Sequence, residues 1–280
     1  MKKLLLFILT LKILALPYNT LQLKKIKTLN CNNNFSFVVI GDNRDGNNIL
    51  KKIISQVNAT QTKFIINNGD LVPDGYNKEF QKYLSILNYS KKPIISVIGN
   101  HEIPWYDGKT NYERIFGKNF FSFIFSNSYF IILDDSNKKE IGEKEYNWLK
   151  KQLKKSQTYK YRFVFMHVPL YDPRKGKYKK GHSLKNLENA KKLNNLFDKY
   201  KVTMLFCSHI HSYFKGIWHK IPYIITGGGG APLNKNSFYH YIEVSVTKDK
   251  VEYHVIQIKA KKPSFLQRII QPIIDILNLN

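Results

Sequence analysis

Two histidines, His209 and His211, are separated by one residue in the segment Ser208-His209-Ile210-His211. The apolar run 202–207 comes directly before them, and its length and composition are typical of a buried strand. In open α/β sheets, ligand sites collect in the crevice outside the carboxyl ends of the strands. A His-x-His pair at such a point can direct both rings towards one small volume, as two metal ions about 3.5–4 Å apart require. Such a pair is also common in ordinary loops, so a metal site needs further ligands in the same setting.

Three earlier apolar stretches end in a similar way. Glycine permits a sharp turn, and Asp, Asn and His supply oxygen and nitrogen ligands. One such residue could simply cap the next helix, but three in succession predict a shared site at one sheet edge. His167, which follows the strand-like stretch 161–165, occupies the same kind of position. The three earlier strand ends are Gly41-Asp42 after 35–40, Gly69-Asp70 after 63–67, and Gly99-Asn100-His101-Glu102 after 93–98.

Helices are expected between these strands. Apolar residues recur at helical spacing between residues 49 and 57 and again between 79 and 89. Each strand–helix–strand step predicts a parallel pair of strands with a right-handed crossover. The remaining expected elements are antiparallel strands of a second sheet at 120–125 and 129–133, and helices at 143–155 and near 184–200.

Taken together, these blocks resemble the calcineurin-like metallophosphoesterase superfamily over residues 35 to about 260. The run Thr226-Gly227-Gly228-Gly229-Gly230 further resembles bacterial members related to purple acid phosphatases. The resemblance implies a four-layer α/β/β/α sandwich, in which two mixed sheets are flanked by helices. It also implies metal-dependent hydrolysis of a phosphate ester by a hydroxide that bridges two metal ions. A metal pair lowers the pKa of a bridging water and binds the attacking and leaving oxygens.

The resemblance also implies a role for each motif residue. Asp70 would bridge two divalent or trivalent metal ions (Mn, Fe or Zn), whose identity the ligand types leave open. Asn100, His167 and His209 would complete the shell of one ion, whereas Asp42 and His211 would bind the other.

His101 is not a metal ligand in this interpretation. It would bind the substrate phosphate near the leaving-group oxygen, together with Asn100, or act as a general acid. Glu102 could orient His101, or it could be a solvated carboxylate at a helix start.

The sequence departs from the family pattern at two positions. The first block, Asp42-Asn43-Arg44, has arginine where relatives commonly have histidine, and arginine cannot ligate a metal. Pro73 stands where purple acid phosphatases have tyrosine. Water, Asp74 or another side chain would have to complete that metal shell. Arg44 could bind a substrate phosphate or pair with Asp45 or Asp74. The alternative function is therefore a non-catalytic phosphate-binding or scaffold protein on the same fold, with an incomplete first metal site.

The ends of the chain suggest export. Met1-Lys2-Lys3 precedes an apolar stretch up to residue 16, which predicts a signal peptide or membrane anchor and a periplasmic or membrane-associated protein. Residues 17–34 are polar and are expected to form a linker. Residues 261–280 predict an amphipathic C-terminal helix after the 35–260 domain. Either terminus could contact a membrane peripherally.

Charge and cysteine content restrict the remaining function classes. The net charge is +25 and is spread along the chain, which is typical of a solvated lysine surface or of attraction to anions such as phosphate esters. The sequence has no specific nucleic-acid reader motif. Two cysteines predict no disulfide framework. The basic loop 171–181 is expected to be a mobile, solvated loop, or else a lid or phosphate-attracting wall beside the metal site. His182 could reach inwards from it. The sequence leaves the oligomeric state open.

Overall fold

Two β-sheets lie face to face at the centre of the molecule. The computed structural model describes residues 16–30, 33–104, 107–174 and 181–259. The first sheet has the order β11-β10-β1-β2-β3, and the second has the order β4-β5-β6-β7-β9-β8. The strands of the first sheet are β1 (Phe35–Ile40), β2 (Ile65–Asn67), β3 (Ile94–Ser96), β10 (His240–Val246) and β11 (Val251–Gln257). Those of the second are β4 (Phe121–Phe125), β5 (Ser128–Ile132), β6 (Tyr161–Phe165), β7 (Met204–Cys207), β8 (Tyr213–Trp218) and β9 (Ile221–Thr226).

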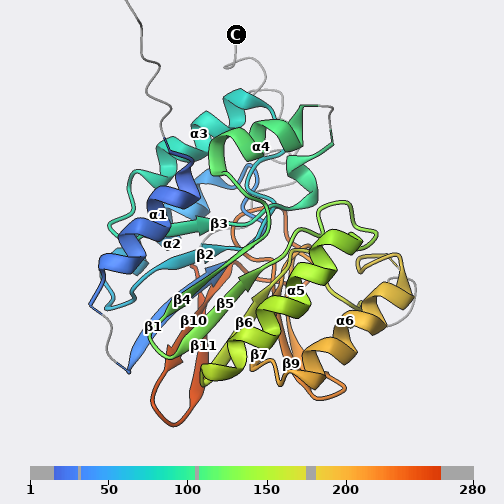
Figure 1. Ribbon diagram of the computed structural model, residues 1–280. Coiled ribbons are helices and arrows are strands. Elements are labelled where there is room, and N and C mark those ends of the chain that lie inside the picture. Colours follow the sequence, from blue (N-terminus) through green and yellow to red (C-terminus); the bar gives the residue numbers. More distant parts are fainter. Residues whose placement is uncertain (1–15, 31–32, 105–106, 175–180, 260–280) are drawn as a thin grey trace, which may run out of the picture.

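Helices cover the outer face of each sheet, which confirms the expected four-layer α/β/β/α sandwich (Figure 1). One apolar cluster joins the first sheet to its helices through Ile53, Phe80 and Phe116. A second joins the other sheet to its helices through Leu149 and Phe197. The helices on the first sheet are α2 (Asn47–Asn58), α3 (Asn77–Leu87) and α4 (Gly108–Phe116), and those on the second are α5 (Glu143–Lys155) and α6 (Leu187–Lys199).

Phenylalanine rings fill the space between the two sheets. Phe37 of β1 stacks on Phe64 with ring centroids 5.6 Å apart. It also meets Phe130, Phe163 and Phe206 of the opposite sheet edge-on, at 5.3, 5.2 and 6.1 Å. Each aromatic pair contributes about 0.5–1.5 kcal/mol beyond the area that it buries. This dense layer fixes how the two sheets lie on one another, and therefore how their strand ends face.

The carboxyl ends of the central strands meet at one edge of the sandwich. In the first sheet β1, β2 and β3 are parallel, and in the second β5, β6, β7 and β9 are parallel. The β4–β5 pair is antiparallel, as the sequence predicts. The loops after the central strands of both sheets therefore lie opposite one another.

A helix covers the open edge of the first sheet. α1 (Tyr18–Thr28) lies along β3, the last strand of its sheet, where the sequence suggested a linker. The Asn19 side chain donates to the Ser96 carbonyl (2.8 Å) and accepts the Ser96 N–H (2.9 Å), as a neighbouring strand would. The linker expectation is thus wrong for this stretch. Its polar composition hid a helix whose buried face is largely polar and includes Asn19 and Gln22.

Neither apolar terminus can be compared with its prediction. The leader up to residue 15 and the C-terminal helix expected at 261–280 lie outside the described residues. None of the described helices has the length and apolar character needed to cross a membrane.

Candidate metal centre

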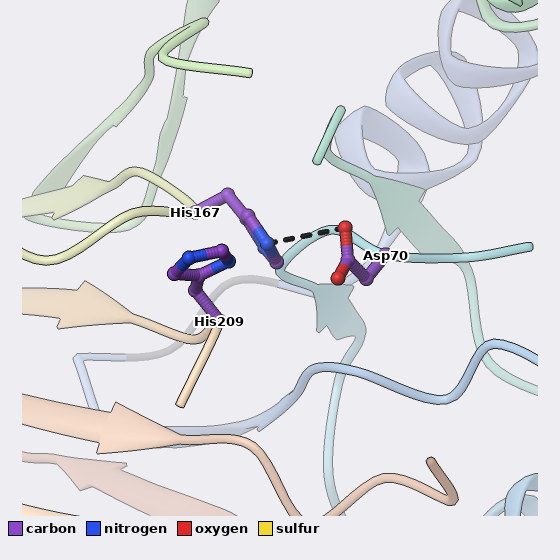
Figure 2. Close-up of side chains that lie close together, drawn as sticks. All are labelled: Asp70, His167 and His209. Carbon is purple, nitrogen blue, oxygen red and sulfur yellow. Dashed lines mark ion pairs between the residues drawn. The ribbon is translucent and has the colours of Figure 1, made fainter. Parts of the chain in front are cut away.

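Asp70, His167 and His209 meet between the two sheets (Figure 2). Asp70 follows β2 of the first sheet, whereas His167 and His209 follow β6 and β7 of the second. The Nε2 atom of His167 lies 3.1 Å from Oδ1 of Asp70. The His167 and His209 rings meet edge-on with centroids 5.2 Å apart. All three residues were predicted ligands, and the structure brings them together.

Asp70 also belongs to a second group, with Asp42 and His211. Nε2 of His211 lies 3.6 Å from Oδ1 of Asp42. The ligand atoms in each group lie within 4.8 Å of one another. This spread is close to twice a metal–ligand bond of about 2.0–2.2 Å. One carboxylate shared by two ligand groups is the arrangement expected for a bridging ligand.

Several potential ligand atoms are buried and lack a hydrogen-bond partner among the described residues. They include both carboxylate oxygens of Asp42 and Oδ1 of Asn100. A buried polar atom without a partner costs about 1–3 kcal/mol. Oxygen and imidazole nitrogen donors of this kind suit Mn, Fe or Zn. The residues present therefore fit a metal centre.

Backbone carbonyls orient two of the imidazoles. Nδ1 of His167 lies 3.0 Å from the Asn68 carbonyl, and Nδ1 of His211 lies 2.7 Å from that of Pro232. A carbonyl can only accept, so each Nδ1 carries a proton, and each Nε2 is the ring atom that would bind a metal once it is deprotonated. Such partners fix the tautomer and direction of a metal-binding histidine.

The ligand loops have unusual backbone conformations. Asp42, Asp70 and His209 have positive φ angles of 56°, 53° and 66°. Such conformations cost about 1–3 kcal/mol each for residues other than glycine and persist only where the surroundings impose them. Here the two loops of the first sheet hold each other, because the Asp42 N–H donates to the Gly69 carbonyl at 3.0 Å.

Two glycines permit the close approach of other chain segments. A Cβ atom on Gly69, whose φ is +94°, would lie 2.5 Å from Nδ1 of His167. A Cβ on Gly227 would lie 2.7 Å from a carboxylate oxygen of Asp42. The glycine run 227–230 therefore packs directly against the candidate site and is more than a turn between strands.

The carboxylates of the site favour a positive charge on the buried His167 ring. Burial opposes ionisation of Asp70, but His167 and His101 lower the pKa of its carboxyl below the usual value. Burial raises the pKa of Asp42, and the Asp70 carboxylate adds to this rise. Burial would lower the pKa of His167, yet Asp70, Asp42 and Asp135 raise it to about 10. Burial and His167 lower the pKa of His209 to about 2, which leaves its ring neutral and able to bind a metal.

His101 lies beside Asp70 and is partly exposed to solvent. Its Nδ1 is 2.5 Å from the Pro73 carbonyl, and its Nε2 is 3.8 Å from Oδ2 of Asp70. About 28% of the side chain is exposed. Nδ1–H donates to the carbonyl, so Nε2 is the atom available to a substrate.

Glu102 has neither of the roles suggested by the sequence. Its carboxylate is fully buried and accepts the backbone N–H groups of Asp70, Leu71, Val72 and Gly99 at 2.6–3.1 Å. Burial and the Asp70 charge raise its pKa to about 8, against the effect of the Gly99 and Val72 hydrogen bonds. Glu102 therefore shapes the loop that carries Asp70.

Arg44 borders the Asp42–Asp70–His211 group. Its φ is 39°, and its N–H donates to the Asp70 carbonyl at 2.9 Å. No ion pair joins it to Asp45 or Asp74 within the described ranges, and its buried Nε lacks a hydrogen-bond partner. Burial lowers the pKa of His211, and the Arg44 charge contributes to this shift. Asp74 is exposed and belongs to neither ligand group, so these residues supply no fourth protein ligand there.

Sequence reasoning missed Asp135, which follows β5. Its buried carboxylate accepts the N–H of His167 at 2.9 Å and that of Val168 at 2.7 Å. It thereby holds the turn that presents the His167 ring. The sequence signal that could have identified it is the pair Asp134-Asp135, which directly follows the predicted strand 129–133. His182, which directly follows the basic loop, does reach inwards, since its ring centroid lies 5.5 Å from that of His209.

Comparison with known proteins agrees with this site. Residues 35–213, more than half of the chain, match the family of calcineurin-like phosphoesterases. A probable cyclic nucleotide phosphodiesterase of Ruthia magnifica subsp. Calyptogena magnifica is 31% identical over 168 residues, which are 58% of this chain and 68% of the relative. The chain belongs to the calcineurin-like phosphoesterase family. It is accordingly a phosphoric ester hydrolase whose family uses divalent metal ions.

Solved structures show the same fold. A purple acid phosphatase from yellow lupin seeds superposes with a TM-score of 0.65 at 17% identity, over 79% of this chain and 51% of the lupin chain. The chain thus spans about half the length of the lupin enzyme. GAP50, the anchor in the inner membrane complex of Plasmodium, superposes with a TM-score of 0.59 at 18% identity, over 83% of this chain and 91% of GAP50.

Proposed function

We propose that the protein hydrolyses a phosphate ester with two metal ions, which Asp70 bridges. The observation that carries this proposal is the membership of Asp70 in both ligand groups. Asn100, His167 and His209 are assigned to one ion, and Asp42 and His211 to the other. The unpartnered buried oxygens of Asp42 and Asn100 support these assignments. When bound, a metal pair supplies an activated water and neutralises the charge on the phosphoryl oxygens.

The residues around the metal centre are assigned to the substrate. Nε2 of His101 lies near Asp70 on a partly exposed side chain, so it can contact a phosphoryl oxygen or protonate the leaving group. Asn100 is assigned to the phosphate as well as to the metal. Arg44 offers a guanidinium that can bind two phosphate oxygens at once. Its unpartnered Nε supports this role.

The proposal is tested by removing single ligands from the full-length protein. Asp70→Ala or His209→Ala is expected to abolish turnover of p-nitrophenyl phosphate and its bis ester while circular dichroism stays unchanged. The control is His254→Ala, an exposed histidine on β11, which should turn over substrate as the unaltered protein does. Unchanged turnover by folded Asp70→Ala would rule the proposal out.

A cyclic phosphodiester is the first substrate to test. The relative from Ruthia is named for cyclic nucleotides, and the chain covers 68% of its length. A panel of cyclic nucleotides, linear diesters and monoesters, each assayed with Mn, Fe and Zn, would rank the substrate classes. A preference for monoesters by a factor of ten or more would exclude this assignment.

A second candidate function is a non-catalytic phosphate-binding or scaffold protein. Within the described part of the chain, the Asp42–Asp70–His211 group has three protein ligands where four are usual, and Arg44 occupies the position where relatives commonly have histidine. The fold of GAP50, described as an anchor, is similar. Metal analysis separates the two functions: about two equivalents with turnover support the enzyme, and about one equivalent without turnover supports the scaffold.

We also propose that the chain is exported and remains near a membrane. The basic start and the apolar stretch 4–16 support this location. Fractionation of cells that express the full chain, with N-terminal sequencing of the product, tests it. Recovery of the intact chain only in the cytosolic fraction would exclude export.

A further inference from the structure

Asn43, which separates the ligand Asp42 from Arg44, has a fully buried side chain. Its Nδ2 donates to the Leu71 carbonyl at 2.7 Å, and its Oδ1 accepts from Nδ2 of Asn67 at 2.6 Å. Leu71 directly follows Asp70. The Asn43 amide therefore connects the loop that carries Asp42 with the loop that carries Asp70.

Buried hydrogen bonds continue from Asn67 of β2 towards β3, the neighbouring strand at the edge of the sheet. Nδ2 of Asn67 also donates to the Tyr83 hydroxyl at 2.8 Å. That hydroxyl lies 3.0 Å from Oγ of Ser96 on β3. The backbone of Ser96 is in turn bonded on both sides by the Asn19 side chain of α1. These five side chains are all at most 3% exposed.

We propose that this chain of residues, called here the polar relay, positions the metal ligands and makes α1 part of the metal centre. The polar relay consists of Asn43, Asn67, Tyr83, Ser96 and Asn19. The inference rests on the proposed function only in that the site binds metal. Its members are positioning residues, because the hydrogen bonds of their side chains go to one another and to backbone groups.

The physical basis is the cost of breaking a buried hydrogen-bond chain. Each link lost leaves a buried donor or acceptor unpaired, at about 1–3 kcal/mol. Asp42 and Arg44, on either side of Asn43, have positive φ angles of 56° and 39°. A loop held in such a conformation needs its neighbours to impose it. Loss of the Asn43–Leu71 contact would let the Asp42 and Asp70 carboxylates move apart.

Two buried tyrosines that both reach Ser96 provide a matched test. Tyr83 lies within the polar relay, between Asn67 and Ser96. Tyr112 forms a side branch, because its hydroxyl donates to the Ser96 carbonyl at 2.7 Å while Asn19 still bonds that same carbonyl. Both rings are at most 2% exposed. Tyr83→Phe and Tyr112→Phe each remove one buried hydroxyl, but only the first interrupts the path to the metal loops.

The measurement is Mn²⁺ affinity of the full chain, by competition with a chelator. Tyr83→Phe is expected to weaken binding of at least one Mn²⁺ about tenfold, the lower end of the effect of outer-shell changes. It should also reduce the electron paramagnetic resonance signal of coupled Mn²⁺ pairs. Tyr112→Phe should leave both quantities unchanged despite a similar loss of thermal stability. Equal Mn²⁺ affinity and equal spectra in the two variants would overturn the inference.

The far end of the polar relay is tested on α1. Asn19→Ala is compared with Gln22→Ala, since both residues are buried polar groups on that helix. Weaker Mn²⁺ binding in Asn19→Ala alone supports the inference, and unchanged binding in both variants overturns it for α1. Because the readout is binding, a protein that binds Mn²⁺ without hydrolysing esters would refute the proposed function and leave the polar relay standing.

Discussion

The carboxylate of Glu102 accepts the backbone N–H of Leu71 at 2.7 Å, across 31 residues of sequence. The same carboxylate also accepts the N–H groups of Asp70, Val72 and Gly99. These four backbone N–H groups are satisfied because both carboxylate oxygens of Glu102 act as acceptors, each for two of them. The residue after His101 therefore acts on the conformation of the loop that carries Asp70, although it binds no metal itself.

Glu102→Gln is predicted to distort that loop. A glutamine has only one oxygen, so its NH₂ group would face two backbone N–H donors. We expect the free energy of unfolding to fall by about 2–4 kcal/mol, since two buried donors lose their acceptor. Urea denaturation and metal analysis measure the two effects. Glu79→Gln is the control, because its carboxylate accepts N–H groups of Asp74 and Tyr76 beyond the metal loop. Equal losses of metal in both variants would contradict this role for Glu102.

His101→Ala is predicted to affect esters according to their leaving group. If Nε2 protonates the leaving oxygen, kcat should fall about 10²–10⁴-fold for an alkyl ester. It should fall far less for a p-nitrophenyl ester, whose leaving group needs no proton. Metal content should be unchanged, because His101 belongs to neither ligand group. An equal fall for both esters would instead assign His101 to phosphate binding alone.

The strand-end motifs could be predicted from the sequence because the signals are local. Asp42, Asp70 and His209 each follow an apolar run within a few residues, and parallel strands bring their ends to one edge. The alternation of strands and helices predicted parallel strand pairs, and the family resemblance implied the four-layer fold. Glycine before two of these ligands also marked the turns.

The supporting residues could not be predicted because their partners are distant in sequence. Asn19 bonds Ser96 across 77 residues, and Asp135 bonds the His167 N–H across 32. The hydrophobic periodicity of a sequence contains no information about which distant polar residues will pair. α1 was missed for a related reason: its buried face includes Asn19 and Gln22, so the apolar pattern of a packed helix is weak.

Arg44→His is predicted to complete the Asp42–Asp70–His211 group. Histidine would offer a neutral nitrogen where arginine offers only donors. We expect the second equivalent of Mn²⁺ to bind more tightly, by about tenfold, in a chelator competition. If Arg44 also binds the substrate phosphate, KM should rise at the same time. Arg44→Gln is the control, since it removes the charge without adding an imidazole. Tighter Mn²⁺ binding in Arg44→Gln as well would attribute the gain to lost repulsion.

His240 is predicted to make the protein less stable in acid. It is fully buried, its Nδ1 lies 2.9 Å from the Phe238 carbonyl, and its Nε2 has no partner among the described residues. Burial lowers its pKa to about 4, against a usual value of 6.5.

The unfolded chain therefore binds a proton at a higher pH than the folded one. The stability that the neutral ring contributes is present above pH 6.5 and is lost as the pH falls from 6.5 to 4. The shift corresponds to about 3 kcal/mol.

His240→Asn can still donate to the Phe238 carbonyl but does not titrate in this range. Urea denaturation of both proteins between pH 4 and pH 8 should give a difference in unfolding free energy that depends on pH. The unaltered protein should lose stability more steeply below pH 6.5, because other titrating groups are common to both chains. Parallel stability curves would show that His240 is protonated equally in the folded and unfolded states.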